Sequence, residues 1–177
     1  VLVQPVIAGP VCRVIGFRTG LGFHAVEVLH EEWQYTVFPL PMSLSAPCGL
    51  DGLHYTKALD TAYQAARLLP QAASYVEVVM IMGKEGPAVI ALRILPAPKA
   101  VTSALMWWAQ GIDLEQAARR VCDGESPKVS PTRDMAAVAC WFSPHAGVVS
   151  DVQGVDRARS TPGVQEVTMN VQPGDIL

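Results

Sequence analysis

Two charged side chains interrupt an otherwise apolar stretch near the middle of the chain, and they are the first candidates for chemistry. Residues 74–99 read SYVEVVMIMGKEGPAVIALRILPAPK, with Glu77 in the first apolar run and Arg93 in the second. A charge inside a buried strand is costly unless it is paired or binds a ligand. Two interpretations of Glu77 follow: a side chain that binds a ligand, or the partner of Arg93 in a structural ion pair.

The runs that carry these two residues predict a β-hairpin. Residues 75–82 and 87–95 are apolar, and the short segment 83–86, with a glycine at each end, separates them. Neither run alternates cleanly between apolar and polar residues, so we expect strands that are covered on both faces.

The elements around the hairpin predict an α+β fold, an antiparallel sheet with helices packed on it. Asp51 is a predicted N-cap, and Asp113 with Gln116 forms a capping-box pattern. We predict strands over 1–8, 11–18, 23–29, 33–40, 134–142 and 164–171, a loop over 39–49, and helices over 51–69, 99–110 and 113–122.

Composition limits the functions that the chain can have. Of the 177 residues, 50% are hydrophobic and 16% are charged, and the net charge is −3 without a basic block. A disordered chain and a nucleic-acid footprint are therefore disfavoured. No apolar run approaches the ~20 residues of a membrane-spanning helix. The four cysteines are widely separated, which favours reduced thiols in a cytoplasmic protein over a zinc or disulfide motif.

Two further groups have alternative interpretations. Arg13 and Arg18 could face an anionic ligand, although solvated strand ends are favoured. Trp107 and Trp108 could form a stacking platform, although their helical spacing with Leu105 favours burial in the core.

The order of these motifs resembles the ATP-grasp ligases, with closest similarity to the branch of L-amino acid ligases and carnosine synthase. The resemblance rests on the Glu-bearing hairpin, on WWAQGIDLEQAARRVCDGE and on the tail DRARSTPGVQEVTMNVQPGDIL. It implies an ATP-grasp-like large domain over 1–126 that lacks its upstream part, followed by a small β-rich C-terminal subdomain over 127–177.

The resemblance also implies an activity. ATP-grasp ligases use ATP and Mg²⁺ to activate a carboxylate as an acyl phosphate, which an amine then attacks to form an amide. We therefore expect part of a dipeptide-forming, ATP-dependent carboxylate–amine ligase. The implied partners are amino acid substrates and the rest of a longer polypeptide, without nucleic acid or membrane, while assembly into a homo-oligomer stays open.

Site residues carry over position by position. Glu77 falls at the first metal-binding Glu, and Gln4 falls at the ribose contact of the hinge strand. The second metal ligand is replaced by Ala91, and Arg93 stands where the family has an Asn, so Arg93 becomes the candidate catalytic residue. The flexible Gly pair that follows is replaced by residues 97–98, Ala-Pro.

These departures leave three functions open. The first is a ligase in which this segment is catalytically impaired or has replaced its ligands. The second is a non-catalytic scaffold or interaction domain of ATP-grasp ancestry. The third is a small-molecule binding module that binds nucleotide without turnover.

Overall fold

A six-stranded antiparallel sheet organises the first 141 residues of the chain. The computed structural model describes residues 7–35, 39–70, 72, 74–140 and 146–176. The strands, in the sheet order β5-β4-β1-β2-β3-β6, are β5 (Gly86–Leu95), β4 (Ser74–Gly83), β1 (Val11–Thr19), β2 (Gly22–Tyr35), β3 (Pro39–Ala46) and β6 (Ala137–Cys140). The antiparallel sheet with packed helices confirms the predicted α+β class.

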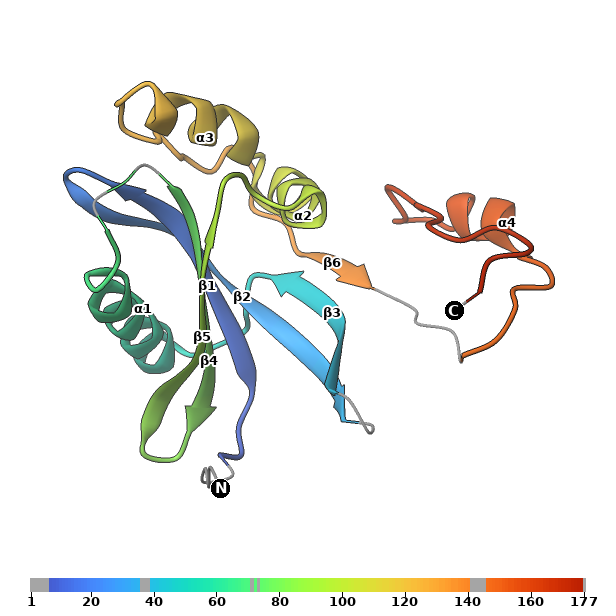
Figure 1. The fold of residues 1–177 in the computed structure, drawn as a ribbon, viewed down its shortest axis with the longest axis horizontal. Coiled ribbons are helices and arrows are strands. Elements are labelled where there is room, and N and C mark those ends of the chain that lie inside the picture. Colours follow the sequence, from blue (N-terminus) through green and yellow to red (C-terminus); the bar gives the residue numbers. More distant parts are fainter. Residues whose placement is uncertain (1–6, 36–38, 71, 73, 141–145, 177) are drawn as a thin grey trace. The chain divides into compact units, whose positions relative to one another are not determined.

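Helices cover both faces of this sheet, as Figure 1 shows. On one face, α1 (Gly52–Ala66) packs through its small buried residues Ala58, Ala62 and Ala66. On the other face lie α2 (Ala100–Gln110) and α3 (Leu114–Cys122). Because side chains alternate along a strand, each central strand supplies one set of residues to each face.

The two layers of the core show this alternation directly. The layer beneath α1 contains Cys12, Val14, Val28, Val76, Val78 and Met80. The layer beneath α2 and α3 contains Ile15, Phe17, Leu29, Tyr75, Leu105, Met106 and Leu114. Residues 13, 77 and 93 belong by their positions to the second layer, so three charged side chains lie on the α2 face.

The predicted hairpin is confirmed as β4 and β5, which a two-residue turn connects. Gly83 pairs with Gly86, and Gly86 adopts φ +128°, a conformation that suits glycine. The register places Glu77 opposite Arg93 on β5 and opposite Ile15 on β1.

The two predicted N-caps are confirmed. The Asp51 carboxylate accepts a hydrogen bond from the N–H of His54, and the Asp113 carboxylate accepts one from the N–H of Gln116. Gly111 ends α2 in the left-handed conformation, with φ +67°.

Two strand predictions and one loop prediction were wrong. Residues 23–29 and 33–35 of the two expected strands lie in the single strand β2, because Glu31, in the polar segment 30–32, is paired by Arg13 and stays in the sheet. Residues 36–38 lie outside the described part of the chain, and residues 39–40 belong to β3. The expected loop 39–49 contains β3, whose prolines at 39 and 41 lie beyond the Ser43–Ala46 stretch that pairs with β6. Proline is tolerated there because that part of β3 is an edge.

The C-terminal region also differs from the predictions. Of the strand predicted over 134–142, residues 137–140 form β6, residues 134–136 are not in a strand, and residues 141–142 lie outside the described part of the chain. Residues 164–171 form no strand and are mostly exposed. Of the strand predicted over 1–8, residues 1–6 lie outside the described part of the chain, and residues 7–8 are not in a strand.

The chain divides into two compact units, Val1–Trp141 and Phe142–Leu177. The second contains α4 (Val155–Arg159) and a bridge between Val148 and Ile176. The boundary predicted at 126/127 stays a prediction, although Thr132 and Met135 bond to the end of α2 in the first unit.

Candidate functional site

The structure brings Glu77 and Arg93 together, as the ion-pair interpretation predicts. Arg93 Nη1 lies 3.4 Å from Oε2 of Glu77. Ala91, two residues before Arg93, is on the same face of β5 and offers no ligand atom. Gln4, predicted to contact the ribose, lies outside the described residues.

Glu77 is the centre of a larger charged cluster that sequence reasoning found only in part. Its side chain has 0% exposure, and its Oε2 also lies 3.3 Å from Arg13 Nη1 and 3.9 Å from Lys99 Nζ. Its other oxygen, Oε1, is buried and has no hydrogen-bond partner among the described residues. One buried carboxylate therefore attracts three cationic groups.

Arg13 joins this carboxylate to a second one. Its Nε donates to Oε2 of Glu31 at 3.3 Å, and its Nη2 donates to Oε1 of the same residue. Since Arg13 is only 6% exposed, its interpretation as a solvated strand end was wrong. Its place in alternation with Ile15 and Phe17, both core residues, is the sequence signal that could have identified it.

These five side chains form what we call the Glu77 cluster: Arg13, Glu31, Glu77, Arg93 and Lys99. Three members are cationic and two are anionic, so the cluster has one surplus positive charge. Burial raises the pKa of the neighbouring Tyr75 well above its ordinary value, and the charge of Glu77 raises it further. The Tyr75 phenol therefore stays neutral beside the cluster.

The donor set of this cluster does not fit Mg²⁺. Magnesium is held by several oxygen ligands in octahedral geometry. Within the described part of the chain, no group of three or more His, Cys, Asp or Glu residues converges to hold a metal. Three cationic groups already lie 3.3–3.9 Å from Oε2 of Glu77, and their charges would repel a divalent ion at this carboxylate. Magnesium binding at Glu77 therefore stays a prediction.

A third buried carboxylate, that of Glu27, connects the two helical layers. Glu27 accepts hydrogen bonds from the Tyr55 hydroxyl of α1, at 3.1 Å, and from the Gln110 amide of α2. Burial, followed by the Glu27 charge, raises the pKa of Tyr55 above its ordinary value. With its polar groups committed to these contacts, Glu27 stabilises the positions of α1 and α2 on the sheet.

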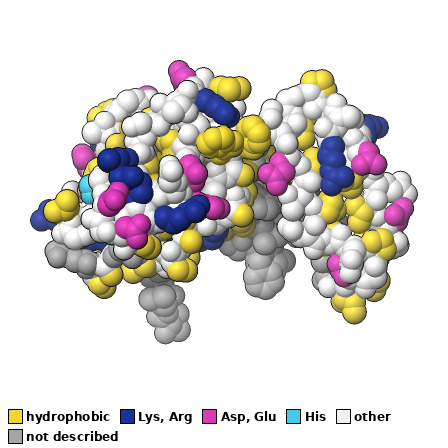
Figure 2. Space-filling view, turned by 90° about the horizontal axis from the view of Figure 1, so that it is seen from above, with side chains coloured by type: hydrophobic (Ala, Val, Ile, Leu, Met, Phe, Trp, Pro, Cys, Tyr) yellow, Lys and Arg dark blue, Asp and Glu magenta, His cyan; other side chains and the backbone are white. Residues whose placement is uncertain are grey.

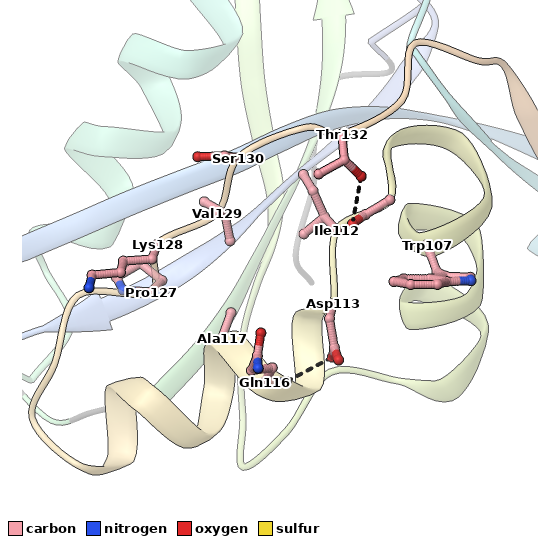
Figure 3. Close-up of a pocket in the computed structure, with 11 residues that line it drawn as sticks. Trp107, Ile112, Asp113, Gln116, Ala117, Pro127, Lys128, Val129, Ser130 and Thr132 are labelled. Atoms are coloured by element: carbon pink, nitrogen blue, oxygen red, sulfur yellow. Dashed lines mark hydrogen bonds between the residues drawn. The ribbon is translucent and has the colours of Figure 1, made fainter.

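A pocket of about 270 Å³ lies between the end of α2, the start of α3 and residues 127–132, as Figure 3 shows. Asp113, the one carboxylate among its lining residues, is already engaged as the cap of α3. The pocket therefore offers no obvious acid–base pair.

The tryptophan pair beside this pocket is only partly as predicted. Leu105 and Met106 are buried, but Trp107 is 44% exposed, so its assignment to the core was wrong. The Arg133 guanidinium lies 5.0 Å from the centroid of the Trp107 ring and 6.0 Å from that of Trp108. This cation–π contact explains how the exposed ring is held.

The surface gives no sign of a continuous basic patch on the face shown in Figure 2, where basic and acidic side chains lie close together in small groups. Among the described helices, none has the length and apolar character needed to cross a membrane.

Comparisons with known proteins find a match to the C-terminal segment of this chain and a match to its fold. The family described as L-amino acid ligase C-terminal domain 2 matches residues 140–177. No curated protein sequence matches.

Three solved structures illustrate the likeness of the fold. An L-amino acid ligase from Bacillus licheniformis has a TM-score of 0.82 at 15% identity, covering 97% of this chain and 45% of its own. A carboxyaminoimidazole ribonucleotide synthase from Aspergillus clavatus, complexed with ATP, has a TM-score of 0.68 at 13% identity, covering 98% and 45%. A protein described as belonging to the ATP-grasp superfamily, from Archaeoglobus fulgidus, has a TM-score of 0.59 at 15% identity, covering 82% and 44%.

These matches confirm the resemblance to ATP-grasp ligases that the hairpin and the tail predicted. The chain spans less than half the length of each of these three structures.

Proposed function

Because the chain has the fold of the ATP-grasp ligases, we propose that it is part of an ATP-dependent carboxylate–amine ligase that joins amino acids into dipeptides. The observation that carries this proposal is the combination of the fold over the whole chain with the family match of its last residues, 140–177. The fold alone does not distinguish between ligases that act on different substrates, because one fold can host several activities. The tail match favours the amino acid ligases among them.

The proposed reaction has two steps. A carboxylate oxygen of one amino acid takes the terminal phosphoryl group of ATP, and ADP leaves. The amine nitrogen of a second amino acid then attacks the acyl carbon, the phosphate leaves with the bonding electron pair, and the nitrogen loses a proton. In both steps negative charge develops on phosphate oxygens, which positive groups fixed in place stabilise.

Arg93 is the residue of this chain that we assign to this task. Its Nη1 is fixed by Glu77, and its side chain is 35% exposed, so the guanidinium is both held and accessible. An arginine donates up to five N–H groups in a planar fork that matches phosphate oxygens. Arg93 would therefore bind and orient the phosphoryl group, whereas Glu77, which also contacts Arg13, would hold the Arg93 guanidinium in position.

A second candidate function rests on the same cluster. Since the Glu77 carboxylate is occupied by three cations, this unit could be a non-catalytic scaffold of a larger ligase, with chemistry performed elsewhere in the protein. The two candidates differ in whether Arg93 affects turnover.

The test is ligase turnover of the complete natural protein that contains this chain. ADP release would be measured with pairs of free amino acids, and the amide product would be identified by mass spectrometry. We expect amino acid-dependent ADP release that falls at least tenfold in Arg93→Gln but not in Lys57→Ala, a matched loss of charge on exposed α1. Turnover that Arg93→Gln leaves unchanged would favour the scaffold, and absence of ADP release with every pair would contradict the ligase.

The same proposal includes a cytoplasmic location, with free amino acids and the rest of the polypeptide as partners. The free cysteines at 12, 48, 122 and 140 support it, because reduced thiols are typical of that compartment. Assembly into a homo-oligomer stays a prediction, which light scattering of the complete protein would test.

A further inference from the structure

The surplus positive charge of the Glu77 cluster is not spread evenly between its members. Glu77 and Glu31 have side-chain exposures of 0% and 1%, and that of Arg13 is 7%. Arg93 and Lys99 have 35% and 47%. Both anionic members are thus buried, and the part of the cluster that solvent and ligands can reach is entirely cationic.

The two accessible cations also retain unused hydrogen-bond donors. Arg93 makes one side-chain hydrogen bond among the described residues, from Nη1 to Glu77. Lys99 Nζ lies 3.9 Å from the same carboxylate, which is beyond hydrogen-bond distance. Because Glu77 attracts both groups without saturating them, their remaining N–H donors are available to a ligand.

The start of α2 adds a further positive contribution at Lys99. Lys99 is the N-cap of this 11-residue helix, it makes no capping side-chain bond, and the first turn contains no acidic residue. The first N–H groups of a helix lack partners within the helix and attract anions. Lys99 and Ala100 are exposed, so this end of the helix is accessible.

We propose that Arg93, Lys99 and the start of α2 form a binding site for a phosphate group that needs no divalent cation. In this site the cationic side chains take the place of a metal, and the buried carboxylates of Glu77 and Glu31 fix the guanidinium groups. The proposal deepens the proposed function, on which it rests for the carrier of the phosphate, ATP or an acyl phosphate.

A phosphate fits this charge distribution better than a carboxylate does. The surplus of one charge in the cluster is increased by the helix end, which acts as roughly half a positive charge. A phosphate with about two negative charges balances that total, whereas a carboxylate leaves it unbalanced. The fork of Arg93 and the point charge of Lys99 are both common phosphate ligands.

The experiment is calorimetric titration of the complete natural protein with inorganic triphosphate in EDTA. We expect binding that Lys99→Ala weakens about tenfold, as loss of one charge-assisted hydrogen bond predicts. Lys57→Ala, which removes the same charge from the α1 face, should leave the affinity unchanged. Lys99 is nearly half exposed, so its substitution should preserve the melting temperature, which serves as the folding control.

Further probes identify the ligand. Acetyl phosphate that competes more strongly than triphosphate would assign the site to an acyl phosphate, and the reverse order would assign it to the nucleotide. Acetate that binds as tightly as either would overturn the preference for phosphate.

The inference is overturned if triphosphate binds only with magnesium, or if both Lys99→Ala and Arg93→Gln bind as wild type in EDTA. Its failure is distinguishable from failure of the proposed function. Metal-free binding without ligase turnover contradicts only the ligase, and turnover without metal-free binding contradicts only this site.

Discussion

Glu77 and Arg93 face each other across the hairpin of β4 and β5, with Arg93 Nη1 3.4 Å from Oε2 of Glu77. The same carboxylate oxygen is 3.3 Å from Arg13, which Glu31 holds from the other side. In this arrangement a candidate metal ligand has become the anchor of a cationic cluster.

The first prediction concerns stability. Glu77→Ala leaves Arg13 without one of its two buried carboxylate partners, and breaking a buried ion pair in this way costs about 3 kcal/mol or more. Urea unfolding should show this loss in the free energy of unfolding. Glu85→Ala, in the exposed turn of the same hairpin, should stay within about 0.5 kcal/mol of wild type. A Glu77→Ala protein that unfolds like wild type would refute the structural role of the pair.

The second prediction concerns the junction of α2 with the segment after α3. A methyl group at Gly111 would lie 2.1 Å from Thr132 Oγ1, and Gly111 has φ +67°. Gly124, with φ +80°, has open space around it. Gly124→Ala should therefore cost roughly 1–2 kcal/mol from backbone strain alone, and Gly111→Ala should cost clearly more. Equal losses in thermal unfolding would show that the segment moves aside freely.

The third prediction is a pH dependence at the start of α1. The pKa of Asp51 is lowered from 3.8, chiefly because its carboxylate accepts a hydrogen bond from the His54 N–H. A lowered pKa in the folded state gives stability that is present above pH 3.8 and is lost as the pH falls through the folded value. Asp51→Ala should lower the melting temperature at pH 7, and the difference from wild type should shrink below pH 3.8.

Asp51→Asn is the matched control, because Asn is an equally good cap that does not titrate. It should melt close to wild type at pH 7. A difference between Asp51→Ala and wild type that is unchanged at acidic pH would contradict a role for the ionised cap.

The fourth prediction concerns cysteine reactivity. Burial, with a smaller contribution from Cys48, raises the pKa of Cys12 to about 12. Because the thiolate is the reactive form, iodoacetamide at pH 8 should label exposed Cys122 and Cys140 well before Cys12. Peptide mass spectrometry would follow the order, and urea should abolish it. Native labelling of Cys12 at the rate of Cys122 would contradict its burial.

Local signals in the sequence were sufficient to predict the elements that begin or end at a turn glycine or a capping residue. The glycines at 83 and 86 identified the hairpin turn, and Asp51 and Asp113 identified the starts of α1 and α3. The opposition of Glu77 and Arg93 did not follow from the turn alone, because the register set at Gly83 and Gly86 would pair Glu77 with Leu92. A bulge between Val79 and Met80 shifts the partner of Glu77 to Arg93.

Features that depend on distant residues could not be predicted in this way. Residues 30–32 were read as the polar end of a strand, because the sequence does not show that Glu31 pairs with Arg13, eighteen positions earlier on β1. The prolines of β3 suggested a loop. The neighbouring sequence does not show that β6 pairs only with Ser43–Ala46 and leaves the prolines at 39 and 41 on an unpaired edge. Lys99 gave no signal as a site residue because its approach to Glu77 depends on where α2 packs.

The central claim, that cationic side chains replace the metal beside Glu77, is tested most directly by ATP titration of the complete protein with magnesium and with EDTA. Wild type is compared with the double variant Ala91→Glu/Arg93→Asn, which restores the family's ligand types. The binding signal of this site is identified by its roughly tenfold weakening in Lys99→Ala. We predict wild-type binding that is equal in both buffers, and binding by the double variant only with magnesium. Wild-type binding at this site that disappears in EDTA would contradict the account.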